Sequence, residues 1–123
     1  MGDFNDYPTN NSMLETLKAL PPSDVSKEGE LYNLMYPIHV SGKGSHKFEG
    51  EWGALDQMIV SANLLNPTNS LFTLSTDAHV FEAEFLLEND EKYLGKQPAR
   101  TYVGMKYKGG FADHLPVYID LWY

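Results

Sequence analysis

The sequence predicts a layered α/β or α+β domain, because short amphipathic segments of helical spacing alternate with apolar segments of strand length. Hydrophobic residues make up 42% of the 123 residues and aromatic residues 13%, which is enough to build a core and argues against disorder. The length fits one ordinary domain and not two. We therefore expect a single domain over residues 1–123.

Three short helices are expected. The first begins after Asn10 or Asn11, either of which can cap it, and Pro21–Pro22 ends it. Its apolar stripe is formed by Met13, Leu14, Leu17 and Leu20. The second spans residues 30–36, directly before a proline, and a third covers part of residues 85–94. These helices are too short to make a layer alone, so they are expected to flank a sheet.

The strands are expected over residues 46–52, 55–62, 71–74, 78–83 and 115–122. Met58–Val60 is continuously apolar, as in a strand that is covered on both faces. The first two strands are placed to pair as a hairpin. In the last, Val117, Ile119 and Leu121 alternate with more polar or amphipathic neighbours, which is typical of a strand with one buried face. Residues 95–108 are predicted to be irregular.

Charge and composition exclude several classes of function. The net charge is −8, which argues against a broad phosphate-binding face and against tight non-specific binding of nucleic acid. A phosphate substrate held through a divalent metal is still allowed, since the metal brings positive charge. There is no cysteine and hence no disulfide or thiolate metal site. No apolar run reaches the roughly 18 residues of a membrane span, and the amino terminus does not look like a signal peptide.

Three polar clusters stand where core packing gives no reason for them. Asp3 and Asn5 are two residues apart, so both point to the same side of an extended segment. Asp56 lies inside an otherwise apolar strand, where a buried carboxylate needs a partner. Asp113 and His114 follow a glycine pair and precede a strand. Each cluster also has an ordinary explanation, as turn chemistry, a residue at a sheet edge, or a surface acid and imidazole. The other histidines, His39, His46 and His79, are expected to be structural or exposed.

Taken together and in order, these clusters resemble the motifs of one family. Gly2–Asp6 resembles the Gly-Asp-Phe-Asn motif of the endonuclease/exonuclease/phosphatase superfamily, which has the deoxyribonuclease I-like fold. Leu55–Ser61 resembles its motif of an acid followed by an apolar strand. Ala112–Val117 resembles its terminal Ser-Asp-His-x-Pro-Val motif, with Ala112 in place of the serine. The segment Gly44–Trp52 resembles a subgroup common among secreted bacterial members.

The resemblance implies the carboxyl-terminal half of a two-sheet αββα sandwich, with a mostly antiparallel sheet and short flanking helices. The amino-terminal half, including the strand that should run into Gly2, has no match here. The hypothesis is that the chain is a fragment of a longer parent protein whose intact mass would exceed 13.9 kDa. The compartment of the parent is left open, with a secreted or periplasmic location as the option that the subgroup suggests. A sheet without its facing sheet exposes an apolar face, so self-association is expected and would be tested by sedimentation.

The resemblance also implies a role for each polar residue. Asp3 would orient or deprotonate the attacking water, and Asn5 would donate a hydrogen bond to the phosphate. His114 would contact the scissile phosphate and stabilise the charge of the transition state, with Asp56 holding its imidazole. Asp113 would help to hold Mg²⁺ or Mn²⁺. A base, an amide donor, an imidazole with its orienting acid and a hard metal ligand suit phosphate ester hydrolysis.

The predicted function is a divalent-metal-dependent phosphodiesterase or phosphatase, that is, a hydrolase using activated water. Its substrate is left open among nucleic acid, lipid and sugar phosphates, and the acidity of the chain argues mildly against DNA. Lys43, Lys47 and Arg100 are the cations that could approach a phosphate, with Lys47 and Arg100 taken as substrate-binding; solvated surface charge is their alternative. Little or no hydrolysis is expected from this chain alone, because the family's metal-binding glutamate lies in the unmatched half.

Two other functions stay open from the residues. In the first, the same loops bind a ligand without catalysis, in a non-catalytic binding or interaction domain. Loss of Asp3, Asn5 or His114 in the parent protein separates the two, because an enzyme then loses turnover by orders of magnitude and a binding domain has none to lose. In the second, the chain is a structural α+β protein whose three motif matches are coincidental.

Overall fold

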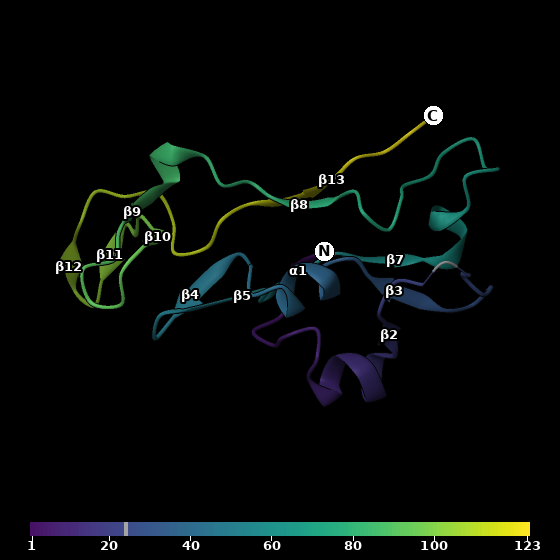
Figure 1. The fold of residues 1–123 in the computed structure, drawn as a ribbon, viewed down its shortest axis with the longest axis horizontal. Helices are drawn as coiled ribbons and strands as arrows, with labels where there is room; N and C mark the ends of the chain where they lie inside the picture. Colours follow the sequence, from purple (N-terminus) through teal and green to yellow (C-terminus); the bar gives the residue numbers. More distant parts are fainter. Residues whose placement is uncertain (24) are drawn as a thin grey trace.

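The structure, a computed structural model, describes residues 1–23 and 25–123 and consists mostly of short strands with a few short helical segments (Figure 1). The strands are β1 (Gly2–Asp3), β2 (Ala19–Leu20), β3 (Leu31–Asn33), β4 (His46–Phe48), β5 (Glu51–Gly53), β6 (Asp56–Gln57), β7 (Ile59–Ser61), β8 (Ala78–Val80), β9 (Leu87–Asn89), β10 (Lys96–Pro98), β11 (Tyr102–Val103), β12 (Lys106–Tyr107) and β13 (Val117–Ile119). The helical segments are a π-helical Ser12–Leu17, α1 (Tyr36–Val40), and 3-10 turns at Ala62–Leu65 and Glu84–Leu86.

The strands of the described residues associate in small groups. β2, β3 and β7 form a three-stranded sheet, and the pairs are β1–β6, β4–β5, β8–β13, β9–β10 and β11–β12. The β2–β3 pairing is parallel and the other pairings are antiparallel. In Figure 1 the β11–β12 hairpin lies at one end of an elongated molecule and the β2–β3–β7 sheet lies toward the other. A strand-rich fold with short helices is thereby confirmed, whereas the two-sheet sandwich stays a prediction.

The predicted strand over residues 46–52 is wrong in one respect, because the chain reverses within it. β4 and β5 pair with each other, with Lys47 opposite Trp52. The reversal occurs at Glu49 and Gly50, whose φ angles are 50° and 92°. Positive φ at both central residues is the geometry of the tight turn that suits the twist of a hairpin. The hairpin is therefore made inside this segment, and not between it and residues 55–62, which instead form β6 and β7.

Two predicted helices are replaced by strands. Residues 31–33 form β3, which lies between β2 and β7, so pairing on both sides outweighs the helical spacing of its leucines. The α-helix begins instead at Tyr36, with Pro37 in its first turn, because proline lacks only an N–H that the first turn leaves free. Residues 85–94 form one 3-10 turn followed by β9, which pairs with β10. Residues 95–108, predicted to be irregular, contain β10, β11 and β12.

The first helix is present but shorter and of a different type from the prediction. It is a π-helix over Ser12–Leu17, and Lys18 ends it in the left-handed conformation with φ 56°. Its cap residue, Asn11, makes no capping side-chain hydrogen bond. Asn10 instead donates from Nδ2 to Asp6 Oδ1 at 2.8 Å. The asparagine is thus used to close the loop after β1 and not to cap the helix.

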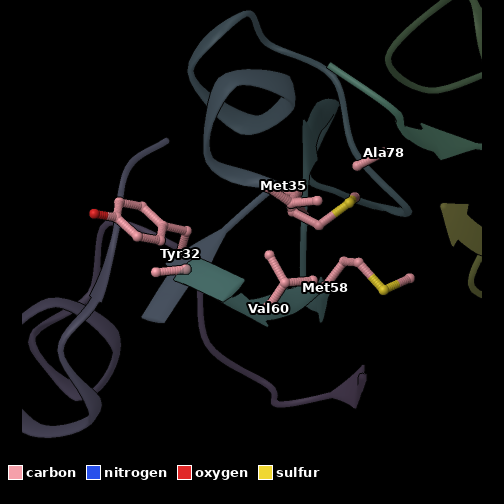
Figure 2. Packing of buried hydrophobic residues seen from close by; sticks show 8 residues of the cluster. Tyr32, Met35, Met58, Val60 and Ala78 are labelled. Atoms are coloured by element: carbon pink, nitrogen blue, oxygen red, sulfur yellow. The ribbon is translucent and has the colours of Figure 1, made fainter. Parts of the chain in front are cut away.

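The core lies over the β3–β7 pair and the start of α1. Its buried members are Tyr32, Leu34, Met35, Ala54, Met58, Val60, Ala62 and Ala78. Figure 2 shows Tyr32, Met35, Met58 and Val60 gathered on these strands, with Ala78 reaching in from β8. Many large apolar side chains lie outside this core, and Phe85, Met105 and Phe111 are each more than half exposed. Exposed apolar side chains are thus present, whereas the uncovered sheet face and self-association stay predictions.

A buried amide network connects the core to the segments that follow β1 and precede β6. Gln57 and Asn33 are both 0% exposed, and Asn33 Nδ2 donates to Gln57 Oε1 at 2.8 Å. Gln57 Nε2 donates to the carbonyl oxygens of Asp6 and Ala54, both at 2.7 Å. The side chain of Gln57, the immediate neighbour of Asp56, thus joins three separate segments of the chain.

Candidate functional site

The first two polar clusters meet through the pairing of β1 with β6. The strands are antiparallel, with Asp3 directly opposite Asp56, and the Phe4 N–H continues the pairing by donating to the Leu55 carbonyl at 3.0 Å. Asp3 Oδ1 accepts a hydrogen bond from the backbone N–H of Asn5 at 2.8 Å. Asn5 has φ 52°, a conformation that asparagine tolerates better than most residues. The turn exposes both the Asp3 carboxylate and the Asn5 side chain.

Asp56 and His114 form an acid–imidazole pair. Asp56 Oδ2 lies 2.7 Å from His114 Nδ1, and the two side chains are 16% and 22% exposed. The same oxygen accepts from Ser45 Oγ at 2.5 Å, and Ser45 Oγ in turn accepts from the Asp56 N–H at 3.3 Å. The bond to Nδ1 orients the ring and leaves its Nε2 edge for another partner. A cleft of about 370 Å³ opens beside this pair, between Gly2 and Val117.

Backbone contacts bring His114 to this position from the far end of the chain. His46 and His114 form an antiparallel bridge, and the Leu115 N–H donates to the Ser45 carbonyl at 2.7 Å. The start of β4 thereby serves as the platform for the Asp113–His114 loop. The carboxylate of Asp3 and the imidazole of His114, 111 positions apart in sequence, lie in one cluster.

The cluster has the donor set of a divalent-cation site. Asp3, Asp56 and His114 each offer one ligand atom, and these atoms lie within 4.8 Å of one another. Cations with bonds of about 2.0–2.4 Å hold opposite ligands about 4–5 Å apart. Carboxylate oxygens suit Mg²⁺ or Mn²⁺, whereas an imidazole nitrogen suits softer divalent metals such as Zn²⁺. Asp113, the predicted metal ligand, is exposed and adjacent to His114 in sequence. It is not among the three described residues whose ligand atoms converge, and its role stays a prediction.

A second imidazole, that of His46, packs against the first in a tilted arrangement. The rings of His46 and His114 are 4.6 Å apart with planes inclined by 40°, and Arg100 Nη2 lies 3.3 Å from His46 Nε2. Burial lowers the pKa of His46, and His114 and Arg100 lower it further, while Asp113 and Asp3 act in the opposite direction. His46 is thus a weak base surrounded by the charged groups of the cluster.

One family model matches nearly the whole chain. The model described as "Endonuclease/Exonuclease/phosphatase family" matches residues 1–122. The chain belongs to the endonuclease/exonuclease/phosphatase family. No curated protein and no solved structure matches the chain. Within the described residues, no helix combines the length and apolar character needed to cross a membrane.

Arg100 and Lys47, the two cations predicted to bind substrate, have different surroundings. Arg100 is half-buried against His46 and therefore borders the cluster. Lys47 points into a buried ion pair, with Nζ 2.8 Å from Asp90 Oδ2 and both side chains 5% exposed. Lys47 Nζ also donates to the Leu94 carbonyl at 2.8 Å. The hydrogen bond from Lys47 to Asp90 lowers the pKa of Asp90. The structure thus brings Arg100 to the cluster and uses Lys47 to join β4 to the loop after β9.

Sequence reasoning missed Ser45 and His46. The histidine was grouped with His39 and His79, which do lie elsewhere: His39 stacks on Tyr7 at 4.7 Å, and His79 contacts Asp120 at 3.2 Å. A usable signal was present, because Ser45 and His46 open the segment Gly44–Trp52 that resembled a subgroup of the family. Polar residues where a strand begins, next to a glycine-containing loop, are typical positions for residues of a functional site.

Proposed function

We propose that this domain provides the catalytic residues of a divalent-metal-dependent phosphoric ester hydrolase that attacks its substrate with an activated water. The membership of the chain in the endonuclease/exonuclease/phosphatase family supports the reaction class. The observation that carries the proposal is the convergence of Asp3, Asp56 and His114, with Asp56 Oδ2 2.7 Å from His114 Nδ1. Two carboxylates and an imidazole that converge beside a cleft form a candidate functional site.

Each side chain has a chemical task in this proposal. Asp3 accepts the proton of the attacking water, for which an exposed carboxylate next to the cleft is suitably placed. Asp56 holds the His114 ring through Nδ1, so that Nε2 faces a phosphoryl oxygen and stabilises its growing charge. Asn5 donates its side-chain N–H groups to the phosphate.

Asp113 is proposed to hold the divalent cation, with Asp3 bordering it. When bound, Mg²⁺ or Mn²⁺ supplies positive charge to the phosphoryl oxygens, which an acidic chain of net charge −8 otherwise lacks. The substrate stays undecided among nucleic acid, lipid and sugar phosphates. The acidity of the chain favours a substrate that needs few phosphate contacts over long DNA.

The test uses the complete natural gene product that contains these residues. With Mn²⁺ or Mg²⁺, hydrolysis is assayed on bis(p-nitrophenyl) phosphate and p-nitrophenyl phosphate, which separate diesterase from monoesterase activity. His114→Ala and Asp3→Asn are expected to lower kcat by about 10²–10⁴-fold, the usual range for a group that acts on protons or charge in the transition state. His79→Ala is the matched control, since that imidazole lies at the β8–β13 pair and contacts Asp120.

Two results would contradict the proposal. In one, turnover persists in the presence of EDTA or in His114→Ala. In the other, the gene product binds Mn²⁺ or phosphate with no turnover on any phosphate ester, which favours the binding-domain alternative.

A further inference from the structure

The unexplained feature next to the cluster is the contact between His46 and Arg100, the single arginine of the chain. Arg100 Nη2 lies 3.3 Å from His46 Nε2. A guanidinium group has only donors and stays protonated in proteins. His46 Nε2 must therefore accept in this contact, which requires a neutral ring that carries its proton on Nδ1.

This tautomer has a cost that the local packing does not offset. His46 Nδ1 is buried, and among the described residues it has no hydrogen-bond partner. A buried donor without a partner carries the full cost of its desolvation, and in a native protein such a group calls for an explanation. The opposite tautomer would leave Nδ1 as an acceptor but would set the Nε2 proton against the guanidinium. The geometry thus favours the Arg100 contact over the satisfaction of Nδ1.

The backbone of Arg100 is tied to the same loop that carries Asp113 and His114. The Arg100 carbonyl accepts from the Gly110 N–H at 3.2 Å, and the Ala99 carbonyl accepts from the Phe111 N–H at 2.7 Å. Position 110 needs a glycine here, because a Cβ would overlap the Ala99 carbonyl. The guanidinium and the imidazole of His114 therefore belong to one rigid arrangement, joined through the His46 ring.

We propose that His46 is a positioning residue which accepts a hydrogen bond from Arg100 and so holds the guanidinium at the rim of the cluster, where its remaining N–H groups clamp the phosphate of the substrate. The inference rests on the proposed function, since it assigns a phosphate to this site. Charge supports it: Asp56 lines the cleft and Asp3 lies in the same cluster, so a phosphate needs cations beyond His114. A planar guanidinium matches two phosphate oxygens at once, and Lys47 is engaged with Asp90.

The first experiment reads the His46 tautomer without any ligand. Long-range ¹H–¹⁵N NMR correlations of the imidazole rings are recorded on the 123-residue chain near pH 7.5. We expect His46 to carry its proton on Nδ1, with an Nε2 signal that changes in Arg100→Gln. A proton on Nε2, or an Nε2 signal that is the same in Arg100→Gln, overturns the positioning role whatever the enzyme does.

The second experiment measures binding of inorganic phosphate to the same chain, followed by the NMR shifts of His114 and by calorimetry, with Mg²⁺ present. Arg100→Gln is expected to weaken binding about tenfold or more, the range for loss of a charge-assisted hydrogen bond. His46→Phe keeps the ring volume but has no acceptor, so it should weaken binding about three- to tenfold. Combined with Arg100→Gln, it should add less than twofold, because both act through one contact.

His46→Gln supplies the rescue. Its side-chain oxygen accepts at a position close to that of Nε2, so phosphate affinity should return to within about twofold of the original chain, which a merely space-filling role of His46 would not produce. If Arg100→Gln weakens binding but His46→Phe does not, this inference fails and the proposed function stands. If the original chain binds no phosphate, the clamp is refuted, and turnover in the natural gene product still decides the proposed function.

Discussion

Replacement of Gln57 by leucine gives the sharpest test of how the site is held. Gln57 is 0% exposed and lies next to Asp56 in a strand of only two residues. Its amide makes three hydrogen bonds of 2.7–2.8 Å, to Asn33 and to the carbonyls of Ala54 and Asp6. Leucine has a similar volume and no polar atoms. Gln57→Leu therefore removes the hydrogen bonds while changing the packing little.

The expected loss of stability follows from the partners that are left behind. The contacts to Asn33 and Ala54 are buried, so each partner loses its hydrogen bond without access to water, at about 1–3 kcal/mol apiece. The Asp6 carbonyl is partly exposed and can be rehydrated, so about 1 kcal/mol is lost there. The sum is about 3–7 kcal/mol, a large share of the ~5–15 kcal/mol that stabilises an ordinary domain.

Urea unfolding followed by circular dichroism measures this loss. With an m-value of about 1.5 kcal/mol per M, even a loss of ~3 kcal/mol lowers the midpoint by about 2 M. Gln97→Leu is the matched control, because Gln97 is half-buried and donates one hydrogen bond, to Glu88 Oε1 at 2.9 Å; its expected loss is about 1 kcal/mol or less. Equal midpoints for Gln57→Leu and Gln97→Leu would refute the reasoning.

Three further predictions follow from burial, charge and sterics. Burial lowers the pKa of His39 from 6.5, so the unfolded chain binds a proton that the native chain does not; stability should fall as the pH drops below 6.5, and His39→Gln should flatten this dependence in urea titrations. Lys47→Met and Asp90→Leu should each destabilise strongly by leaving a buried charge, whereas the double variant should recover most of the loss in a double-mutant cycle. Gly110→Ala forces a Cβ into a backbone carbonyl and should cost about 3 kcal/mol or more in urea unfolding. Gly95→Ala, which meets open space at φ 74°, should cost about 1–2 kcal/mol, and a larger loss there would contradict the steric argument.

Sequence patterns predicted the structure best where the local residue pattern agrees with the final fold. The polar clusters around Asp3, Asp56 and His114 were found because acids and amides interrupt apolar segments, and the family resemblance ordered them. The strand at 31–33 was misread because Leu31, Leu34 and Met35 have helical spacing. The extended conformation of residues 31–33 is set by β2 and β7 on either side, and such tertiary pairing is not visible in a local window.

The residues that were missed or misplaced depend on contacts between distant segments. His46 meets Arg100 across 54 positions and His114 across 68, so composition and spacing near His46 give no sign of either partner. Lys47 looked like a cation free to bind substrate. Because side chains alternate along β4, Lys47 points to the opposite side of the strand from His46. There it forms an ion pair with Asp90.

The position of the site depends on the register between β1 and β6. Strands of two residues cannot fix that register by their own pairing. β1 and β6 share two residue pairs, Gly2 with Gln57 and Asp3 with Asp56. A slip of one residue would exchange the faces of Asp56 and Gln57, so that the amide would meet His114 and the carboxylate would enter the core. The three hydrogen bonds of Gln57 oppose that slip, because an ionised carboxylate could not replace an amide that donates to two carbonyls. The residue whose amide joins three segments of the chain is thus also the one that keeps Asp56 beside the imidazole. Gln57→Leu should accordingly broaden or shift the His114 signals at urea concentrations where the chain is still folded.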